Sequence, residues 1–107
     1  MADDIQVVRP QGRLDSTSGP AFEKDLIRTI DIGSRRMVLD FSGLQYISSA
    51  GLRVVLLAAK RMKLSGGRLA LCSLSRQIGE VFEISGFGSI LDIYPSYDEA
   101  VAALLAK

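Results

Sequence analysis

Short apolar runs alternate along this chain with longer stretches in which apolar residues recur at helical spacing. The strand-like runs cover residues 5–8, 37–41, 69–74 and 90–94, and each is soon followed by Pro or Ser. The run 37–41, interrupted only by Asp40 near its end, is typical of a strand buried on both faces of a sheet. Residues 12–15 follow closely after Pro10, so we expect them to pair with residues 5–8 as a hairpin.

Two helical stretches are expected in the first two thirds of the chain. The first comes after the turn residues 16–19, takes Pro20 as its first helical residue and ends near Gly33. The second has the strongest helical pattern of the chain and fills most of residues 45–64, after a short strand. The residues Ser65-Gly66-Gly67 mark its end as a C-cap.

Two further helices are expected in the last third of the chain. One is closed by Gly86 and Gly88, and the other opens at a capping box formed by Ser96 and Glu99. The side chains expected to face inward are Ile78, Val81, Phe82 and Ser85 on the earlier helix, and Val101, Leu104 and Leu105 on the later one. The elements together predict an α/β fold, in which a single domain of residues 1–107 has about five strands in a mixed sheet and about four helices.

The composition narrows the range of functions. With 48% hydrophobic and 23% charged residues, the chain is globular, and its net charge of +1 argues against a protein that binds nucleic acid directly. The absence of histidine excludes Ser-His and Cys-His nucleophiles and His-ligated zinc, so we expect no cofactor and no metal. Cys72, the single cysteine, lies in an apolar run and is expected to be a buried thiol.

No segment is expected to enter a membrane. The longest uninterrupted apolar run, residues 100–106, is far shorter than the roughly twenty residues that a spanning helix needs. The first residues, Met1-Ala2-Asp3-Asp4, lack the basic and apolar regions of a signal peptide. We therefore expect a cytoplasmic protein.

Candidate chemistry is concentrated where a short strand meets the strongest helix, at Tyr46-Ile47-Ser48-Ser49-Ala50-Gly51-Leu52. Either Ser48 or Ser49 is suited to be the N-cap, and both serines could serve only as caps. The segment matches neither a P-loop nor a dinucleotide-binding fingerprint. A serine nucleophile would need a lysine base, and no Ser-X-X-Lys occurs, so an enzyme is not expected.

The strongest helix has two distinct faces on an ideal wheel. With Arg53 set at 0°, the inward stripe on the far side consists of Leu52, Val55, Ala58, Ala59 and Met62. On the opposite face lie Ser49 at about −40°, Lys60 at about −20°, Leu64 at about +20°, Leu57 at about +40° and Ala50 at about +60°. Isolated exposed leucines are common, yet leucines flanked by cations beside a serine-rich helix start are also typical of a protein-docking surface.

The sequence resembles the STAS domain family over essentially the whole chain, and most closely the bacterial anti-sigma-factor antagonists. The resemblance rests on Gly12-Arg13-Leu14-Asp15, Pro20, Met37-Val38-Leu39-Asp40-Phe41-Ser42-Gly43, the serine segment, Gly66-Gly67-Arg68-Leu69 and Val81-Phe82-Glu83-Ile84-Ser85-Gly86-Phe87. The usual family pattern at the serine segment is Asp-Ser-Ser-Gly-Leu, with its first serine modified. Ser48 here stands in place of the Asp, and Ala50 in place of the second Ser.

The resemblance implies a phosphorylatable switch protein. An anti-sigma factor with serine kinase activity and a GHKL-type ATP site would bind the unmodified protein and phosphorylate Ser49, with Ser48 as second choice, and a serine phosphatase would reverse the modification. The surface that binds the partner would comprise Asp15, Ser48 and Ala50 from the matched segments. It would also include Arg53, Leu57 and Lys60 on the outward face of the strongest helix, which the wheel indicates and not the resemblance. The alternative is a STAS interaction module of another system, such as a lipid-transport complex or a stress-signalling assembly.

Overall fold

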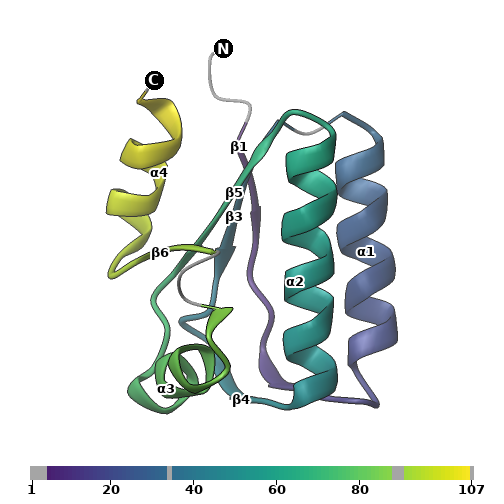
Figure 1. The fold of residues 1–107 in the computed structure, drawn as a ribbon, viewed down its shortest axis with the longest axis vertical. Helices are drawn as coiled ribbons and strands as arrows, with labels where there is room; N and C mark the ends of the chain where they lie inside the picture. The colour runs from purple at the N-terminus through teal and green to yellow at the C-terminus, as the bar shows by residue number, and fades with distance from the viewer. Residues whose placement is uncertain (1–4, 34, 88–90, 107) are drawn as a thin grey trace.

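The computed structural model of the chain describes residues 5–33, 35–87 and 91–106. Their helices and strands alternate along the chain (Figure 1). In order they are β1 (Ile5–Val8), β2 (Gly12–Leu14), α1 (Gly19–Asp31), β3 (Arg36–Asp40), β4 (Leu44–Ile47), α2 (Ser49–Leu64), β5 (Arg68–Cys72), α3 (Arg76–Ile84), β6 (Asp92–Tyr94) and α4 (Tyr97–Leu105). The expected α/β class is confirmed.

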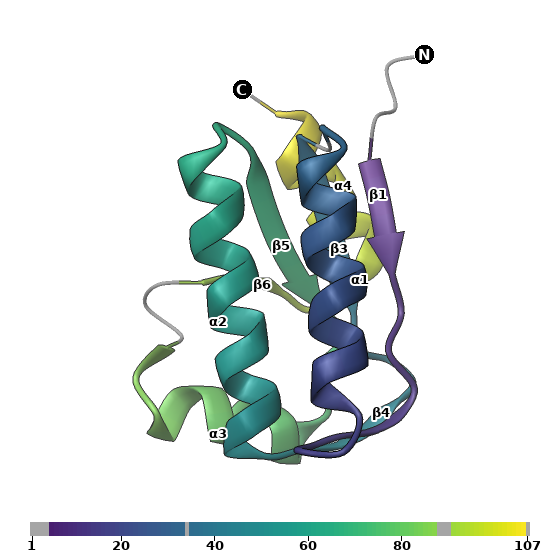
Figure 2. The same cartoon turned by 90° about the vertical axis from the view of Figure 1, so that its right-hand side faces the viewer.

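All the strand pairs in the described residues are parallel. The central sheet has four strands in the order β1-β3-β5-β6, and β2 pairs with β4 in a second, two-stranded sheet. The expected hairpin between residues 5–8 and 12–15 is therefore wrong, and so is the expected mixed sheet. Figure 2 shows the reason: after β1 the chain continues in the same direction instead of turning back, so β2 meets β4 below the central sheet.

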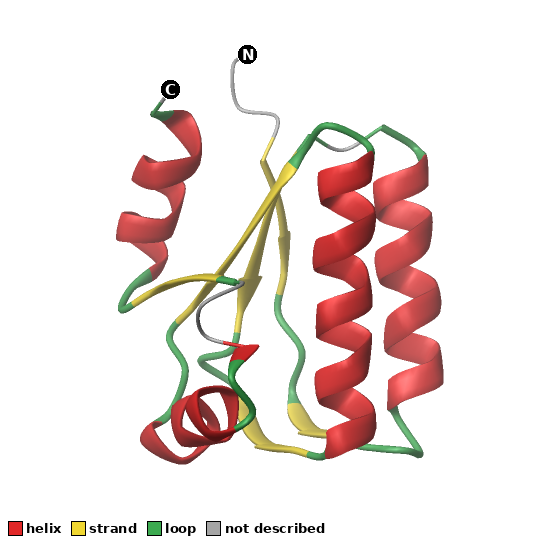
Figure 3. Ribbon diagram, viewed as in Figure 1, coloured by secondary structure: helices red, strands yellow, loops and turns green. Residues whose placement is uncertain are grey.

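The central sheet is covered on both faces, which explains why its two middle strands, β3 and β5, are buried on both sides. Figure 3 shows α1 and α2 on one side and α4 on the other. Side chains alternate between the two sides: Met37 and Leu39 of β3 join the core under α1 and α2, whereas Val38 joins the smaller core under α4. Cys72 also lies in this smaller core and is fully buried, as expected, and its burial raises the pKa of the thiol.

Most of the helix boundaries and inward faces were predictable. The inward stripe of α2 is confirmed, since Leu52, Val55, Ala58 and Met62 are buried and Ala59 packs against the core. The Oγ of Ser96 accepts a hydrogen bond from the Glu99 N–H at 3.1 Å and so caps α4.

Three local expectations were wrong. Pro20 is the second residue of α1, because the helix begins at Gly19. Ser85 is exposed and ends α3, where its Oγ donates to the Phe82 carbonyl. Leu105 is 47% exposed at the end of α4, while Leu104 fills the core. The expectations for Gly88 and Ile90 lie outside the described residues. Within the described part of the chain, every helix is too short or too polar to cross a membrane.

Candidate functional site

The start of α2 is fixed to β2 by backbone contacts. The Ser48 N–H donates to the Leu14 carbonyl at 2.9 Å, and Gly12 bonds to Gly43 at the other end of the same strand pair. Gly51, in the first turn of α2, packs directly on this strand: a Cβ at Gly51 would lie 2.5 Å from the Leu14 carbonyl oxygen. The residue after Ile47 is therefore held in place by a rigid two-stranded sheet, and the helix starts at the edge of that sheet.

Ser48 and Ser49 have different environments, which resolves the choice of N-cap. Ser48 is extended (φ −95°, ψ 176°), and its Oγ accepts the Gly51 N–H at 3.3 Å, so Ser48 is the N-cap and is half-buried. Ser49 is the first helical residue and is exposed. Its hydroxyl has no hydrogen-bond partner among the residues that the structure describes. The geometry leaves the Ser49 Oγ free to react or to meet a partner.

Asp15 shapes the loop that faces this helix start. One of its carboxylate oxygens accepts the backbone N–H groups of Thr17 (3.0 Å) and Ser18 (3.2 Å), and the other lies 3.5 Å from Arg13 Nε. These backbone hydrogen bonds, Ser18 first, hold the pKa of Asp15 below its ordinary value. The Ser18 Oγ also serves this turn, donating to the Arg13 carbonyl at 2.7 Å, and so does not cap α1. Asp15 is thus ionised, and its carboxylate stabilises the turn beside the start of α2.

A groove runs between the first turns of α1 and α2, beside Ser49. It has a volume of about 250 Å³. The α2 side is lined by predicted site residues, Ala50, Arg53 and Leu57, together with Val54; the α1 side is lined by Ser16, Gly19, Pro20 and Glu23. We call these eight residues the serine groove. Lys60 is exposed on α2 but lies outside the lining.

The outward face predicted for α2 is exposed. Leu57 is 39% and Leu64 88% exposed, and Arg53 and Lys60 are exposed between them. Arg53 makes no ion pair within the described residues, whereas Arg13 both approaches Asp15 and stacks on the Tyr46 ring at 4.2 Å. Arg53 is therefore the unpaired cation of the serine groove.

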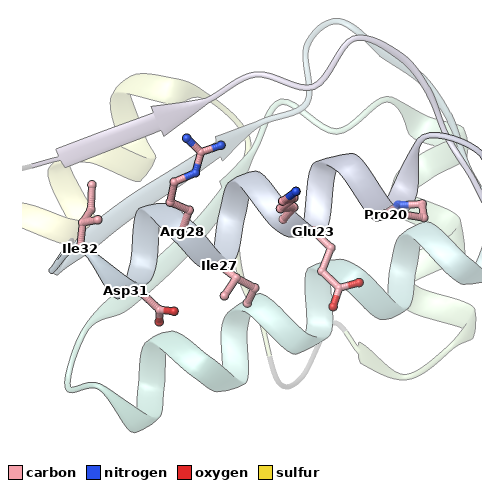
Figure 4. Close-up of a pocket in the computed structure, with 7 residues that line it drawn as sticks. Pro20, Glu23, Ile27, Arg28, Asp31 and Ile32 are labelled. Carbon is pink, nitrogen blue, oxygen red and sulfur yellow. The ribbon is translucent and has the colours of Figure 1, made fainter.

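A larger hollow of about 690 Å³ lies along the outer side of α1 (Figure 4). It shares Pro20 and Glu23 with the serine groove. In Figure 4, Glu23, Ile27 and Asp31 point from α1 toward α2 at successive helical turns. Asp31 accepts a bond from Arg61 at 3.3 Å, which links the far ends of the two helices. The serine groove is thus one end of a continuous surface over the helix pair.

Sequence reasoning missed the contribution of α1 to this site. Pro20 was taken as a helix start and as part of the family pattern, and Glu23 was not considered, although both line the serine groove. One signal was available: Pro20 follows a turn that begins at Asp15, in the segment that the family resemblance already included. A wheel drawn for a single helix shows what lies on its surface but not which neighbour closes a groove beside it.

The sequence of this chain is similar to those of known proteins. Residues 2–100 match the STAS domain family. A Bordetella bronchiseptica protein named as an anti-sigma factor antagonist, BtrV, is 46% identical over 101 residues, which cover 94% of this chain and 87% of that protein. The anti-sigma-B factor antagonist of Bacillus subtilis is 32% identical over 91 residues, covering 85% of this chain and 82% of its own length.

Solved structures share the fold. A crystal structure of a Thermotoga maritima protein, described as an anti-sigma factor antagonist, superposes with a TM-score of 0.93 at 24% identity, over 99% of this chain and 92% of that one. The anti-sigma factor antagonist SpoIIAA in its unphosphorylated form gives a TM-score of 0.74 at 21% identity, over 96% of this chain and 90% of its own. These likenesses concern the fold alone.

Proposed function

This chain belongs to the STAS domain family, and we propose that it works there as a partner-switching anti-sigma factor antagonist. Unmodified, it binds an anti-sigma factor that is also a serine kinase of the GHKL type; phosphorylated on Ser49, it releases that partner. A serine phosphatase restores the unmodified form, and the cycle takes place in the cytoplasm. The curated relatives, which carry the name of anti-sigma factor antagonists, support the binding part of this proposal.

The observation that carries the proposal is the contrast between the two serines. The Ser48 oxygen is used to cap α2, whereas the Ser49 hydroxyl is exposed and unpaired in the described part of the chain. In the phosphorylation step, the Ser49 Oγ would attack the γ-phosphorus of ATP as its proton passes to a base on the kinase. The new Oγ–P bond would replace the bond to ADP, which leaves. Ser49 is the better acceptor because its hydroxyl is exposed, whereas the Ser48 Oγ is half-buried and already accepts the Gly51 N–H.

The physical effect of the phosphate is local. It adds a charge of about −1.5 to −2 and three acceptor oxygens. At the first residue of α2 the positive end of the helix dipole favours that charge, so the domain should stay folded. In a contact that had accepted a neutral hydroxyl, the same charge is costly to desolvate. The partner is thus released without a large rearrangement of the domain.

The surface that binds the partner is proposed to extend from the Asp15 loop across the serine groove. Asp15, Ser48 and Ala50 border the modified residue, and Arg53 and Leu57 continue the contact along α2. Lys60 adds a cation at the edge of this surface. Leu57 supplies exposed apolar area at the centre, where interface residues contribute most to affinity.

The test is site-resolved phosphorylation. The protein is incubated with ATP and a candidate kinase from its own genome, and intact mass and phosphopeptides are measured. We expect one added phosphate, located on Ser49 and lost in Ser49→Ala, whereas Ser48→Ala, the matched control next to it, keeps the phosphate. A phosphate mapped to Ser48 would overturn the assignment of the site.

A further inference from the structure

The serine groove beside Ser49 contains Arg53, a cation that forms no ion pair within the described residues. Arg53 lies one helical turn after Ser49, so the two side chains are neighbours on the same face of α2, with about 5–6 Å between their Cβ atoms. Arg53 lines the serine groove with Leu57 and Glu23. No carboxylate of the described residues lies within ion-pair distance of its guanidinium.

The other charged groups near the helix start are already engaged or repel a phosphate. Arg13 is held by Asp15 at 3.5 Å and by the ring of Tyr46 at 4.2 Å. Asp15 is ionised and used by its own turn. Glu23 reaches from α1 toward α2 (Figure 4), but it forms no ion pair with Arg53, in contrast to the Asp31–Arg61 pair farther along the same two helices.

We propose that the guanidinium of Arg53 binds the phosphate on Ser49. A phosphoserine dianion at the first turn attracts the unpaired guanidinium one turn later, and a guanidinium binds phosphate oxygens bidentately. Arg53 then turns from the serine groove toward Ser49. This inference rests on the proposed modification of Ser49 and adds a second component to the switch: the groove loses a cation at the same time as the helix start gains an anion.

The test measures the second pKa of the phosphate by ³¹P NMR titration at low salt. Phosphoserine is incorporated at position 49 during synthesis of the full chain, so no kinase is involved. A neighbouring cation favours the dianion, and its removal should raise this pKa, which is about 6 in an ordinary phosphoserine. We expect Arg53→Gln to raise it by about 0.7 unit, the size expected in water for the loss of one charge about 4 Å away, as in a bidentate contact.

Three variants make the titration specific. Arg53→Lys keeps the cation and should retain most of the wild-type pKa. Lys63→Gln changes the net charge equally on the same helix but far from Ser49, and should leave the pKa unchanged. Arg13→Gln tests the competing cation. A second observation, a shift of the Arg53 Nε–Hε NMR signal on phosphorylation, reports the same contact without any substitution.

The outcomes separate this inference from the proposed function. Three results would each contradict binding of the phosphate by Arg53. They are an unchanged phosphate pKa in Arg53→Gln, a shift of that pKa in Arg13→Gln alone, and equal shifts in Arg53→Gln and Lys63→Gln. Because the phosphate is installed without a kinase, none of these results bears on whether a kinase modifies Ser49. Conversely, failure of every candidate kinase would remove the proposed function but would leave the titration result intact.

Discussion

Two leucines on the same helix should respond oppositely to truncation if α2 has one face for folding and one for binding. Leu52 is 6% exposed and belongs to the main core, whereas Leu57 is 39% exposed and lines the serine groove. Leu52→Ala should cost about 2–5 kcal/mol of unfolding free energy. Leu57→Ala should cost about 1 kcal/mol, because complete burial of a leucine contributes about 2 kcal/mol and Leu57 is only partly buried.

The assay pairs two measurements on each variant: the urea midpoint and the affinity for the partner. Leu57→Ala should weaken binding by about 1–2 kcal/mol, roughly 5- to 30-fold, while the urea midpoint falls by only about 0.3–1 M. Leu52→Ala should lower the urea midpoint strongly and bind normally per folded molecule. A large loss of stability at Leu57 with unchanged affinity would refute the reasoning, since it would place Leu57 in the core and the partner elsewhere.

Three more predictions concern the frame that supports the site. Gly51→Ala should destabilise the fold by about 1–3 kcal/mol, measured by urea unfolding, because the added Cβ meets the Leu14 carbonyl; unchanged stability would mean that α2 is not held against β2. Burial raises the pKa of Asp40, but hydrogen bonds from Ser42 and Arg9 outweigh it and hold that pKa below its ordinary value. The ionised Asp40 therefore stabilises the fold above about pH 4, and this stabilisation is lost as the pH falls through the lowered pKa. In Asp40→Asn, the free energy of unfolding should accordingly fall less steeply as the pH is lowered below about 4. Buried Cys72 should react with a thiol reagent only after unfolding, and rapid reaction of the native protein would contradict its place in the core.

The sequence was informative wherever a signal is local. The N-cap at Ser96, the inward stripe of α2 and the exposure of Leu57 each depend on the spacing of a few consecutive residues, and each is confirmed. The exposure of Leu64 follows from the same wheel. In these places the helical periodicity of the sequence is enough to predict which side chains are buried, because the neighbouring elements do not change which side of the helix faces the core.

The errors occurred where distant segments decide the outcome. Residues 5–8 and 12–15 are close in sequence, yet each pairs in parallel with a strand from much farther along the chain. A parallel partner leaves no local turn signal, so the short separation wrongly favoured a hairpin. The role of Glu23 in the serine groove was missed for the same reason, because it depends on how α1 packs against α2.

The proposed switch is tested most directly by the affinity of the partner for the unmodified and the phosphorylated protein. Isothermal titration calorimetry should compare unmodified protein with protein carrying phosphoserine at position 49, against the same kinase-type anti-sigma factor, with Ser49→Ala as the neutral control. The account predicts that Ser49→Ala binds like the unmodified protein and that the phosphate weakens binding by about tenfold or more, equivalent to about 1.4 kcal/mol. Equal affinities for the phosphorylated and unmodified proteins would contradict the switch.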